Sequence, residues 1–139
     1  MTESDDALNF GTLNAKNLHL DENIAVYGLT EEPLSLISYL NWLEHTRIAF
    51  PDLHVQNQPY RQIIGQGDCT ATISVLIGTN TGPWGLPQYL TPSPVAATGN
   101  KFSVLHYTIC RWQDGEIVEM RVNLDLLGIL NKVGLGDLI

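Results

Sequence analysis

Residues 101–124 read KFSVLHYTICRWQDGEIVEMRVNL, and this stretch decides the fold. Residues 101–112 are rich in β-branched and aromatic side chains, a composition typical of a long strand. Asp114 and Gly115 follow as a pair that strongly favours a tight hairpin turn. Residues 116–124 are then the returning strand, so the stretch predicts a long antiparallel hairpin.

Three further strands are predicted before this hairpin. Residues 69–78, CTATISVLIG, are rich in β-branched residues, and residues 54–65 precede them with a turn at residues 66–68. Residues 23–29, NIAVYGL, have the composition of a shorter strand that ends near a glycine. The four long strands follow one another closely, as in an antiparallel meander.

One long helix is predicted between the first strand and the meander. Thr30 is a suitable N-cap, and Glu31 and Glu32 favour the positive end of the helix. Pro33 fits the first helical turn, and Pro51 ends the helix near residue 50. An apolar stripe for core packing is formed by Leu36, Leu40 and Leu43.

These elements predict a single α+β domain over residues 1–139. We expect a curved antiparallel sheet that wraps around helices into a cone with an internal pocket. Residues 1–20 give no clear prediction, because Gly11 and several asparagines interrupt any helical period. Residues 126–139, LLGILNKVGLGDLI, form an apolar tail in which one or two helical turns are expected.

The composition is that of a globular protein. Of 139 residues, 44% are hydrophobic and 16% are charged, and the formal net charge is -8. An acidic surface without a cluster of Lys and Arg repels phosphate, so nucleic acid is not expected as a partner. No apolar run reaches membrane-spanning length, and residues 1–10, MTESDDALNF, lack the apolar segment of a secretory signal. We therefore expect a soluble cytoplasmic protein with no membrane partner.

Cysteine and histidine spacings indicate neither a disulfide framework nor a metal site. Cys69 and Cys110 both fall inside predicted strands, where reduced buried thiols are expected. No pair of histidines has metal-ligand spacing together with a carboxylate, so no metal is predicted.

Several segments, in this order and spacing, resemble one protein family. These are FPDLH at 50–54, GTNTGPWGLP at 78–87, RWQDGEIVE at 111–119, and Asp125 leading into LLGILNKVGL. Together they resemble the SnoaL-like polyketide cyclases of the nuclear transport factor two-like, or cystatin-like, superfamily. The resemblance covers roughly residues 30–135. It implies a homodimer of cone-shaped subunits and cofactor-free aldol ring closure on a polyketide ester.

The resemblance also implies site residues and shows where this chain departs from the family. The family's acid/base aspartate, which follows an E-x-W pattern on the last strand, falls on Asp125. Glu119 matches this pattern, but Arg121 stands at the tryptophan position. Tyr27 and Gly28 stand where the family has a histidine, and the family's first long helix looks shortened or broken. A non-catalytic binding protein, an isomerase and an epoxide hydrolase of the same fold therefore stay open as alternatives.

The chemistry expected of Asp125 depends on its surroundings. Aldol closure needs a group that takes a proton from a carbon beside a carbonyl and returns one to the new alkoxide. A carboxyl group in an apolar pocket can do both, because burial raises its pKa towards neutrality. The alternative is a helix N-cap, since Asp125 directly precedes the apolar LLGIL. The two roles do not exclude each other.

Arg121, His106 and His54 are candidate ligand-binding residues. If Arg121 points inward, it favours an anionic or carbonyl-rich ligand; otherwise it makes a cross-strand ion pair at the surface, of little energetic value. A histidine exchanges protons near neutral pH. The alternatives are a hydrogen-bonded core side chain for His106 and an exposed one for His54.

Aromatic side chains complete the predicted pocket for a small hydrophobic ligand with carbonyl groups. Tyr27, Tyr107 and Trp84 can supply flat apolar walls, or each can be an ordinary core aromatic. Trp84 lies in the segment at 78–87, whose glycines and prolines make a short constrained loop. Composition alone favours a plain turn here, and the resemblance favours a pocket rim. No cofactor is expected.

Overall fold

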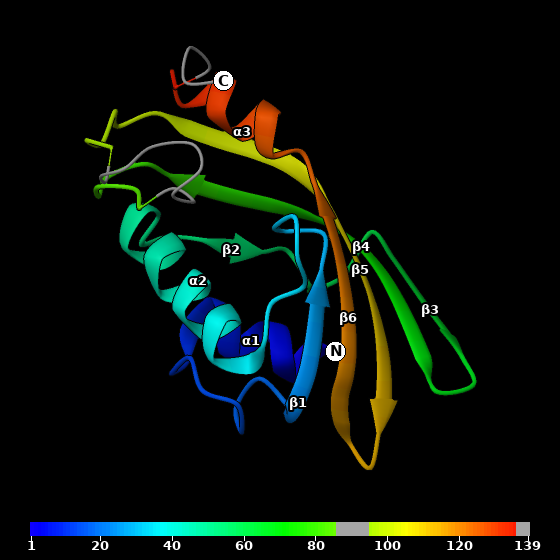
Figure 1. The fold of residues 1–139 in the computed structure, drawn as a ribbon. Helices are drawn as coiled ribbons and strands as arrows, with labels where there is room; N and C mark the ends of the chain where they lie inside the picture. The colour runs from blue at the N-terminus through cyan, green and yellow to red at the C-terminus, as the bar shows by residue number, and fades with distance from the viewer. Residues whose placement is uncertain (86–94, 136–139) are drawn as a thin grey trace.

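The computed structural model describes residues 1–85 and 95–135, and Figure 1 shows its ribbon. The described part of the chain forms three helices and six strands. In chain order these are α1 (Thr2–Phe10), β1 (Leu20–Tyr27), α2 (Leu36–Ala49), β2 (His54–Val55), β3 (Gln62–Gln66), β4 (Cys69–Thr79), β5 (Lys101–Gln113), β6 (Glu116–Leu124) and α3 (Leu126–Lys132).

The strands form one mixed sheet in the order β1-β6-β5-β4-β2, and β3 pairs with β4 beside this path. The hairpin predicted from residues 101–124 is confirmed, with Gln113 opposite Glu116. The prediction of a wholly antiparallel sheet is wrong in one pair, because β1 runs parallel to β6. No hairpin turn connects β1 to β6, so no turn signal in the local sequence sets their relative direction.

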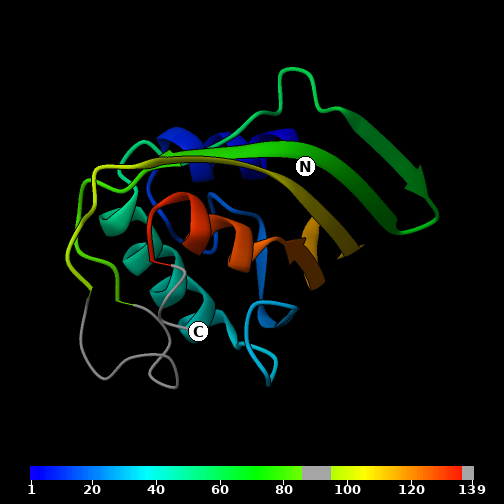
Figure 2. The ribbon, with the colours of Figure 1, turned by 90° about the horizontal axis from the view of Figure 1, so that it is seen from above.

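The sheet curves around the helices, which confirms the α+β prediction. Figures 1 and 2 show α1 and α2 on the concave side and α3 near one end of the long strands. Side chains of β5 alternate between the two faces, as a strand requires. Phe102, Val104 and Thr108 are buried on the concave face, whereas Leu105 and Ile109 are exposed on the convex face.

Two predicted elements begin or divide differently in the structure. The helix predicted from Thr30 begins at Leu36, with Ser35 as its N-cap. Leu34 instead pairs with Val26, with N–H···O distances of 2.8 and 3.0 Å, and this pairing holds residues 30–34 outside the helix. The strand predicted at residues 54–65 is divided into β2 and β3, because Pro59 between them has no N–H for a ladder.

The helix α1 was not predicted because it lacks the apolar stripe of an ordinary surface helix. Its buried side chains are Ser4 and Asp5, which are both polar. Their partners lie elsewhere in the chain, as the Ser4 hydroxyl donates to the Leu18 carbonyl at 2.8 Å. Such a helix depends on tertiary contacts that the local pattern does not display.

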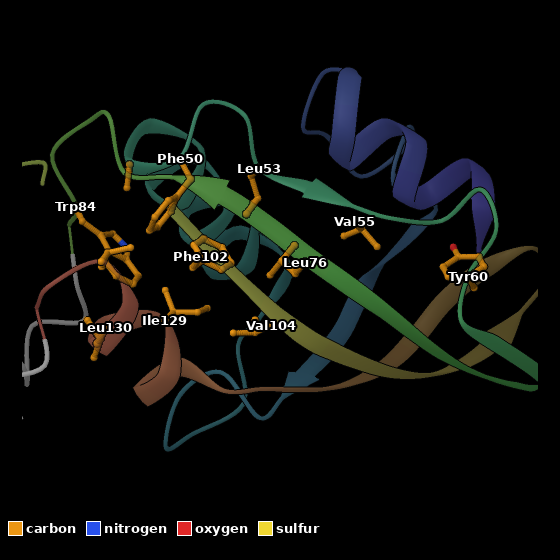
Figure 3. Close-up of a cluster of buried hydrophobic side chains, with 12 residues drawn as sticks. Phe50, Leu53, Val55, Tyr60, Leu76, Trp84, Phe102, Val104, Ile129 and Leu130 are labelled. Carbon is orange, nitrogen blue, oxygen red and sulfur yellow. The ribbon is translucent and has the colours of Figure 1, made fainter. Parts of the chain in front are cut away.

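Buried apolar side chains form two clusters. One surrounds Phe50, whose ring meets Trp84 and Phe102 edge to face at centroid distances of 4.9 and 5.0 Å (Figure 3). Ile129 and Leu130 of α3 belong to the same cluster, so the predicted helical tail packs as core. The other cluster joins β1 and β6 to α2.

Candidate functional site

The interior of the fold contains a pocket between the concave face of the sheet and the helices α1 and α2. Most of its lining is apolar, and its volume is about 50 Å³. Its polar lining residues are Ser4, Asp5, Tyr39, Thr46, His106 and Thr108. A mainly apolar cavity with a few converging polar groups is the usual form of a small-molecule site.

Asp5 is the acidic group of this pocket. Its carboxylate is buried and accepts a hydrogen bond from the Tyr60 hydroxyl. Burial raises the pKa of Asp5 from 3.8 to about 6, although the hydrogen bond from Tyr60 opposes this change. The group therefore changes charge much closer to neutral pH than an exposed aspartate does.

His106 lines the same pocket as a neutral imidazole. Its Nδ1 lies 3.3 Å from the Ser74 hydroxyl, and its Nε2 lies 3.4 Å from the Thr108 hydroxyl. Burial lowers the pKa of His106 to about 4. His106 is thus the one predicted ligand-binding residue that the described structure places in the interior pocket, where it is also hydrogen-bonded as its alternative reading required.

The expectation that Asp125 lies in a dry cavity is wrong. Its side chain is exposed and caps α3 by accepting the Gly128 N–H at 2.8 Å. The side chain of Leu124 points into the interior, so the next residue leaves the pocket as the chain turns into α3. Asp125 lies instead in an open hollow beside Leu105 and Tyr107 on the outer surface.

Arg121 and Tyr27 also lie on the convex face rather than in the interior. The Arg121 guanidinium lies 3.0 Å from Glu119 and 4.3 Å from the centre of the Tyr27 ring. Glu119 also meets Arg111 of β5 at 3.5 Å. Arg121 thus makes a surface ion pair, as its alternative predicts, but within β6 and not across strands, since the contact that crosses strands is that of Arg111 with Glu119. Such exposed pairs contribute little to stability.

The remaining predicted residues are separated from the pocket as well. Tyr107 is 40% exposed on the convex face. His54 packs its ring against Phe10 at 5.4 Å. Trp84 is buried against Phe50, so its core reading holds, and its backbone pairs with Val95. Residues 86 and 87, the last two of the segment predicted as a pocket rim, lie outside the described residues.

Sequence reasoning missed Asp5 and Tyr60. Asp5 belongs to an acidic segment without clear periodicity, and its partner lies 55 positions further along the chain. No local motif links the two residues. Only the docking of α1 against the segment between β2 and β3 brings the carboxylate and the phenol together.

Over residues 1–85 and 95–135, no three His, Cys, Asp or Glu side chains gather as metal ligands. None of the helices in the same residues has the length and apolar character needed to cross a membrane.

The chain matches a family model described as SnoaL-like polyketide cyclase over residues 1–133. Among proteins with curated descriptions, none matches. The family match covers α1 as well as the sheet, so the helix that supplies Asp5 lies within the region shared with the family.

Solved structures with the same fold include three with high coverage. AclR from Streptomyces galilaeus has a TM-score of 0.76 at 21% identity, with 96% of this chain and 77% of that chain covered. IdmH from Streptomyces antibioticus has a TM-score of 0.73 at 23% identity, with coverage of 96% and 94%. A protein with a ketosteroid isomerase-like fold from Catenulispora acidiphila, solved with trimethylamine, has a TM-score of 0.69 at 18% identity, with coverage of 96% and 91%.

Proposed function

Because the chain belongs to the SnoaL-like polyketide cyclase family, we propose that it binds a small hydrophobic compound with carbonyl groups in its interior pocket and acts on it by acid/base chemistry. The observation that carries the proposal is the buried carboxyl group of Asp5, with a pKa of about 6, in a mainly apolar cavity. A group that titrates near the working pH is the most effective acid/base catalyst.

The proposed acid/base group is Asp5 in place of Asp125. In an aldol closure, the Asp5 carboxylate takes a proton from the carbon beside a carbonyl, and the electrons of that C–H bond form an enolate. The enolate carbon then bonds to a second carbonyl carbon of the same molecule. The proton held by Asp5 passes to the alkoxide that results, so the carboxylate is regenerated without any cofactor.

Tyr60 and His106 support this chemistry through hydrogen bonds. The Tyr60 hydroxyl donates to Asp5 and fixes which carboxylate oxygen is free for the substrate. The neutral ring of His106, flanked by hydroxyl groups of Ser74 and Thr108, gives the opposite wall polar groups that can orient a carbonyl. Both interactions place polarity at a few points of an apolar cavity.

Proton exchange at carbon tests the proposal without knowledge of the natural substrate. A panel of aromatic β-keto esters in D₂O is followed by NMR, and deuterium uptake beside the carbonyl is compared with the buffer rate. We expect the unaltered protein and Asp125→Asn to accelerate uptake on at least one ester, and Asp5→Asn to lose the acceleration. Loss in Asp125→Asn alone would return the acid/base role to Asp125.

A non-catalytic binding protein of the same fold is the second candidate. The observation that favours it is the exposed side chain of Asp125, which caps a helix where the family resemblance implies a catalytic acid. This candidate predicts ester binding, detected by saturation-transfer NMR, without acceleration of exchange in any variant. An epoxide hydrolase gains no support, because Arg121 and Asp125 do not meet in the interior pocket.

The proposed assembly is a homodimer, and the proposed location is the cytoplasm. An apolar area on the convex face supports the first proposal, since exposed Leu105, Tyr107 and Ile109 form a row along β5. Two free cysteines, Cys69 and Cys110, accord with a reducing compartment.

A further inference from the structure

The interior pocket is too small in this structure for the ligand proposed for it. Its volume is about 50 Å³, whereas sites for drug-sized molecules usually have roughly 300–1,000 Å³. The present cavity can hold water molecules but no aromatic ester. One of its walls must therefore move before such a ligand enters.

The helix α1 is the wall that the fold can most easily release. It contributes Ser4, Asp5 and Leu8 to the lining of the pocket, and its N-cap residue Met1 lines the pocket as well. Every fully buried apolar side chain of the described residues lies between Leu18 and Val133, so α1 supplies none of them. Met1, Ala7 and Leu8 are only partly buried against the two clusters. Displacement of α1 would therefore leave the fully buried core in place, whereas displacement of α2 would remove Tyr39 and Leu43 from one cluster.

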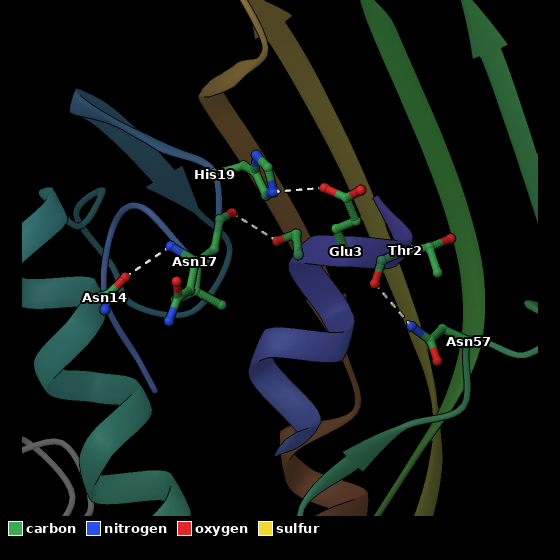
Figure 4. Close-up of polar contacts among 8 residues, drawn as sticks. Thr2, Glu3, Asn14, Asn17, His19 and Asn57 are labelled. Carbon is green, nitrogen blue, oxygen red and sulfur yellow. Dashed lines mark hydrogen bonds and ion pairs between the residues drawn. The ribbon is translucent and has the colours of Figure 1, made fainter. Parts of the chain in front are cut away.

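Hydrogen bonds also attach α1, including one that Arg47 of α2 donates to the Leu8 carbonyl. Asn9 exchanges two with the backbone of Val55, at 2.7 and 2.9 Å. Asn57 donates to the Thr2 carbonyl at 3.3 Å, and Glu3 meets His19 at 3.1 Å (Figure 4). Groups of this kind exchange protein partners for water when they are exposed, so the net cost of separation is modest for each.

We propose that α1 is a movable lid over the interior pocket, and that the Asp5–Tyr60 hydrogen bond holds this lid closed. The lid turns after Gly11, whose carbonyl accepts a hydrogen bond from Arg47 of α2 at 2.8 Å. Residues 12–17, which are exposed or half-buried, absorb the motion. The idea rests on the proposed function in one respect, since that function supplies the reason for opening. The motion itself is a property of the free protein.

The charge of Asp5 controls how often the lid opens. Asp5 is faced by the amino group of Met1 and by Asp6 on its own helix, by Tyr60, and by Tyr39 and Cys110 from the elements packed against it. Burial raises the pKa of both Tyr39 and Cys110, so neither ionises between pH 5 and 8. Asp5 does ionise in this range, and burial then disfavours the closed state. Opening should become about tenfold more frequent between pH 5 and pH 8.

Hydrogen exchange measured by mass spectrometry tests the opening of the α1 lid without any ligand. Protection of residues 1–10, corrected for the intrinsic pH dependence of exchange, is compared with that of β5 in the same sample. We expect residues 1–10 to open more often than β5 unfolds, with protection falling about tenfold from pH 5 to pH 8. Exchange of residues 1–10 and of β5 at one common free energy of opening would contradict the proposal that α1 is a lid.

Three variants test the role of the Asp5–Tyr60 hydrogen bond. Asp5→Asn keeps an acceptor for Tyr60 but cannot ionise, so it should lose the dependence on pH. Asp6→Asn makes the same change at the neighbouring, less buried position and should retain that dependence. Tyr60→Phe removes the donor and should lower protection of residues 1–10 at both pH values. A dependence on pH that persists in Asp5→Asn would show that the charge of Asp5 does not control opening of the lid.

The outcomes also distinguish the lid proposal from the proposed function. If α1 opens as described but the protein accelerates no proton exchange on any ester, the proposed chemistry is contradicted and the lid is supported. If the protein accelerates exchange while α1 stays closed, the chemistry is supported and the lid is contradicted.

Discussion

At the scale of single residues, the pH dependence of stability separates two buried groups with opposite effects. The folded pKa of Asp5 is about 6 instead of 3.8, so the folded state binds more protons and stability falls as pH rises from about 4 to 6. The folded pKa of His106 is about 4 instead of 6.5, so stability rises over nearly the same range. The two effects oppose each other, each with an upper limit of about 3 kcal/mol.

Removal of one group should therefore reveal the other. In Asp5→Asn, we expect the free energy of unfolding to rise steadily with pH between 4 and 6.5, because only the His106 effect remains. The unaltered protein should show a much flatter curve. Urea unfolding at several pH values measures both curves. A flat curve for Asp5→Asn would contradict the assigned pKa of Asp5 or of His106.

Asn80 is a second residue whose side chain connects separate segments. Its amide donates to the carbonyls of Ala49 and Gly82 at 3.3 and 3.0 Å, and its carbonyl accepts from the Thr98 N–H at 2.9 Å. Asn80→Ala removes these three hydrogen bonds at a fully buried position, and we expect a loss of about 3 kcal/mol in the free energy of unfolding. Asn100→Ala, at an exposed position, should change stability by less than about 0.5 kcal/mol.

The sequence could predict residue roles only where the partner is local. Asp125 as a helix cap was one of two readings, and it is correct because the cap acceptor and Gly128 lie three positions apart. The location of Asp125 in a dry pocket was the other reading, and it depended on which way the chain turns after β6. Asp5 could not be recognised, since its burial arises from contacts with distant segments.

At the scale of elements, the strands with regular composition were predicted almost to their ends. The predicted strand at 69–78 became Cys69–Thr79, and that at 101–112 became Lys101–Gln113. Composition and turn signals are local, so they set these elements directly. The start of α2 and the parallel pairing of β1 depend on tertiary pairing, and for that reason they could not be predicted from local signals.

Gly28 allows the end of β1 to lie directly against β6. Its φ is +100°, and a Cβ there would lie 2.0 Å from the Val122 carbonyl oxygen. Gly28→Ala must therefore separate the two strands, and we expect a loss of at least about 2 kcal/mol in the free energy of unfolding. Gly65→Ala is the matched control, because nothing lies within 4 Å of its added Cβ. Equal effects of the two changes would contradict this explanation.

At the scale of the whole molecule, the two faces of the sheet differ in what covers them. The helices α1 and α2 cover the concave face, whereas the described residues leave the convex face uncovered. On that face Ile109 is 51% exposed and lies opposite Ala71 on β4, which is itself opposite Ile64 on β3. This row continues across β6 to Arg121. An exposed apolar row bordered by charged side chains is typical of a surface that pairs with another protein surface.

The proposed homodimer can therefore be tested by one charge placed on this row. Ile109→Glu should convert a dimer into a monomer in sedimentation equilibrium, because a buried unpaired carboxylate strongly disfavours association. Ile63→Glu is the matched control: its side chain is 53% exposed, but it pairs with Thr72, whose buried side chain marks the opposite face of the sheet. We expect this variant to remain dimeric. A monomeric unaltered protein, or equal dissociation of both variants, would show that the convex face of β5 is not the dimer interface.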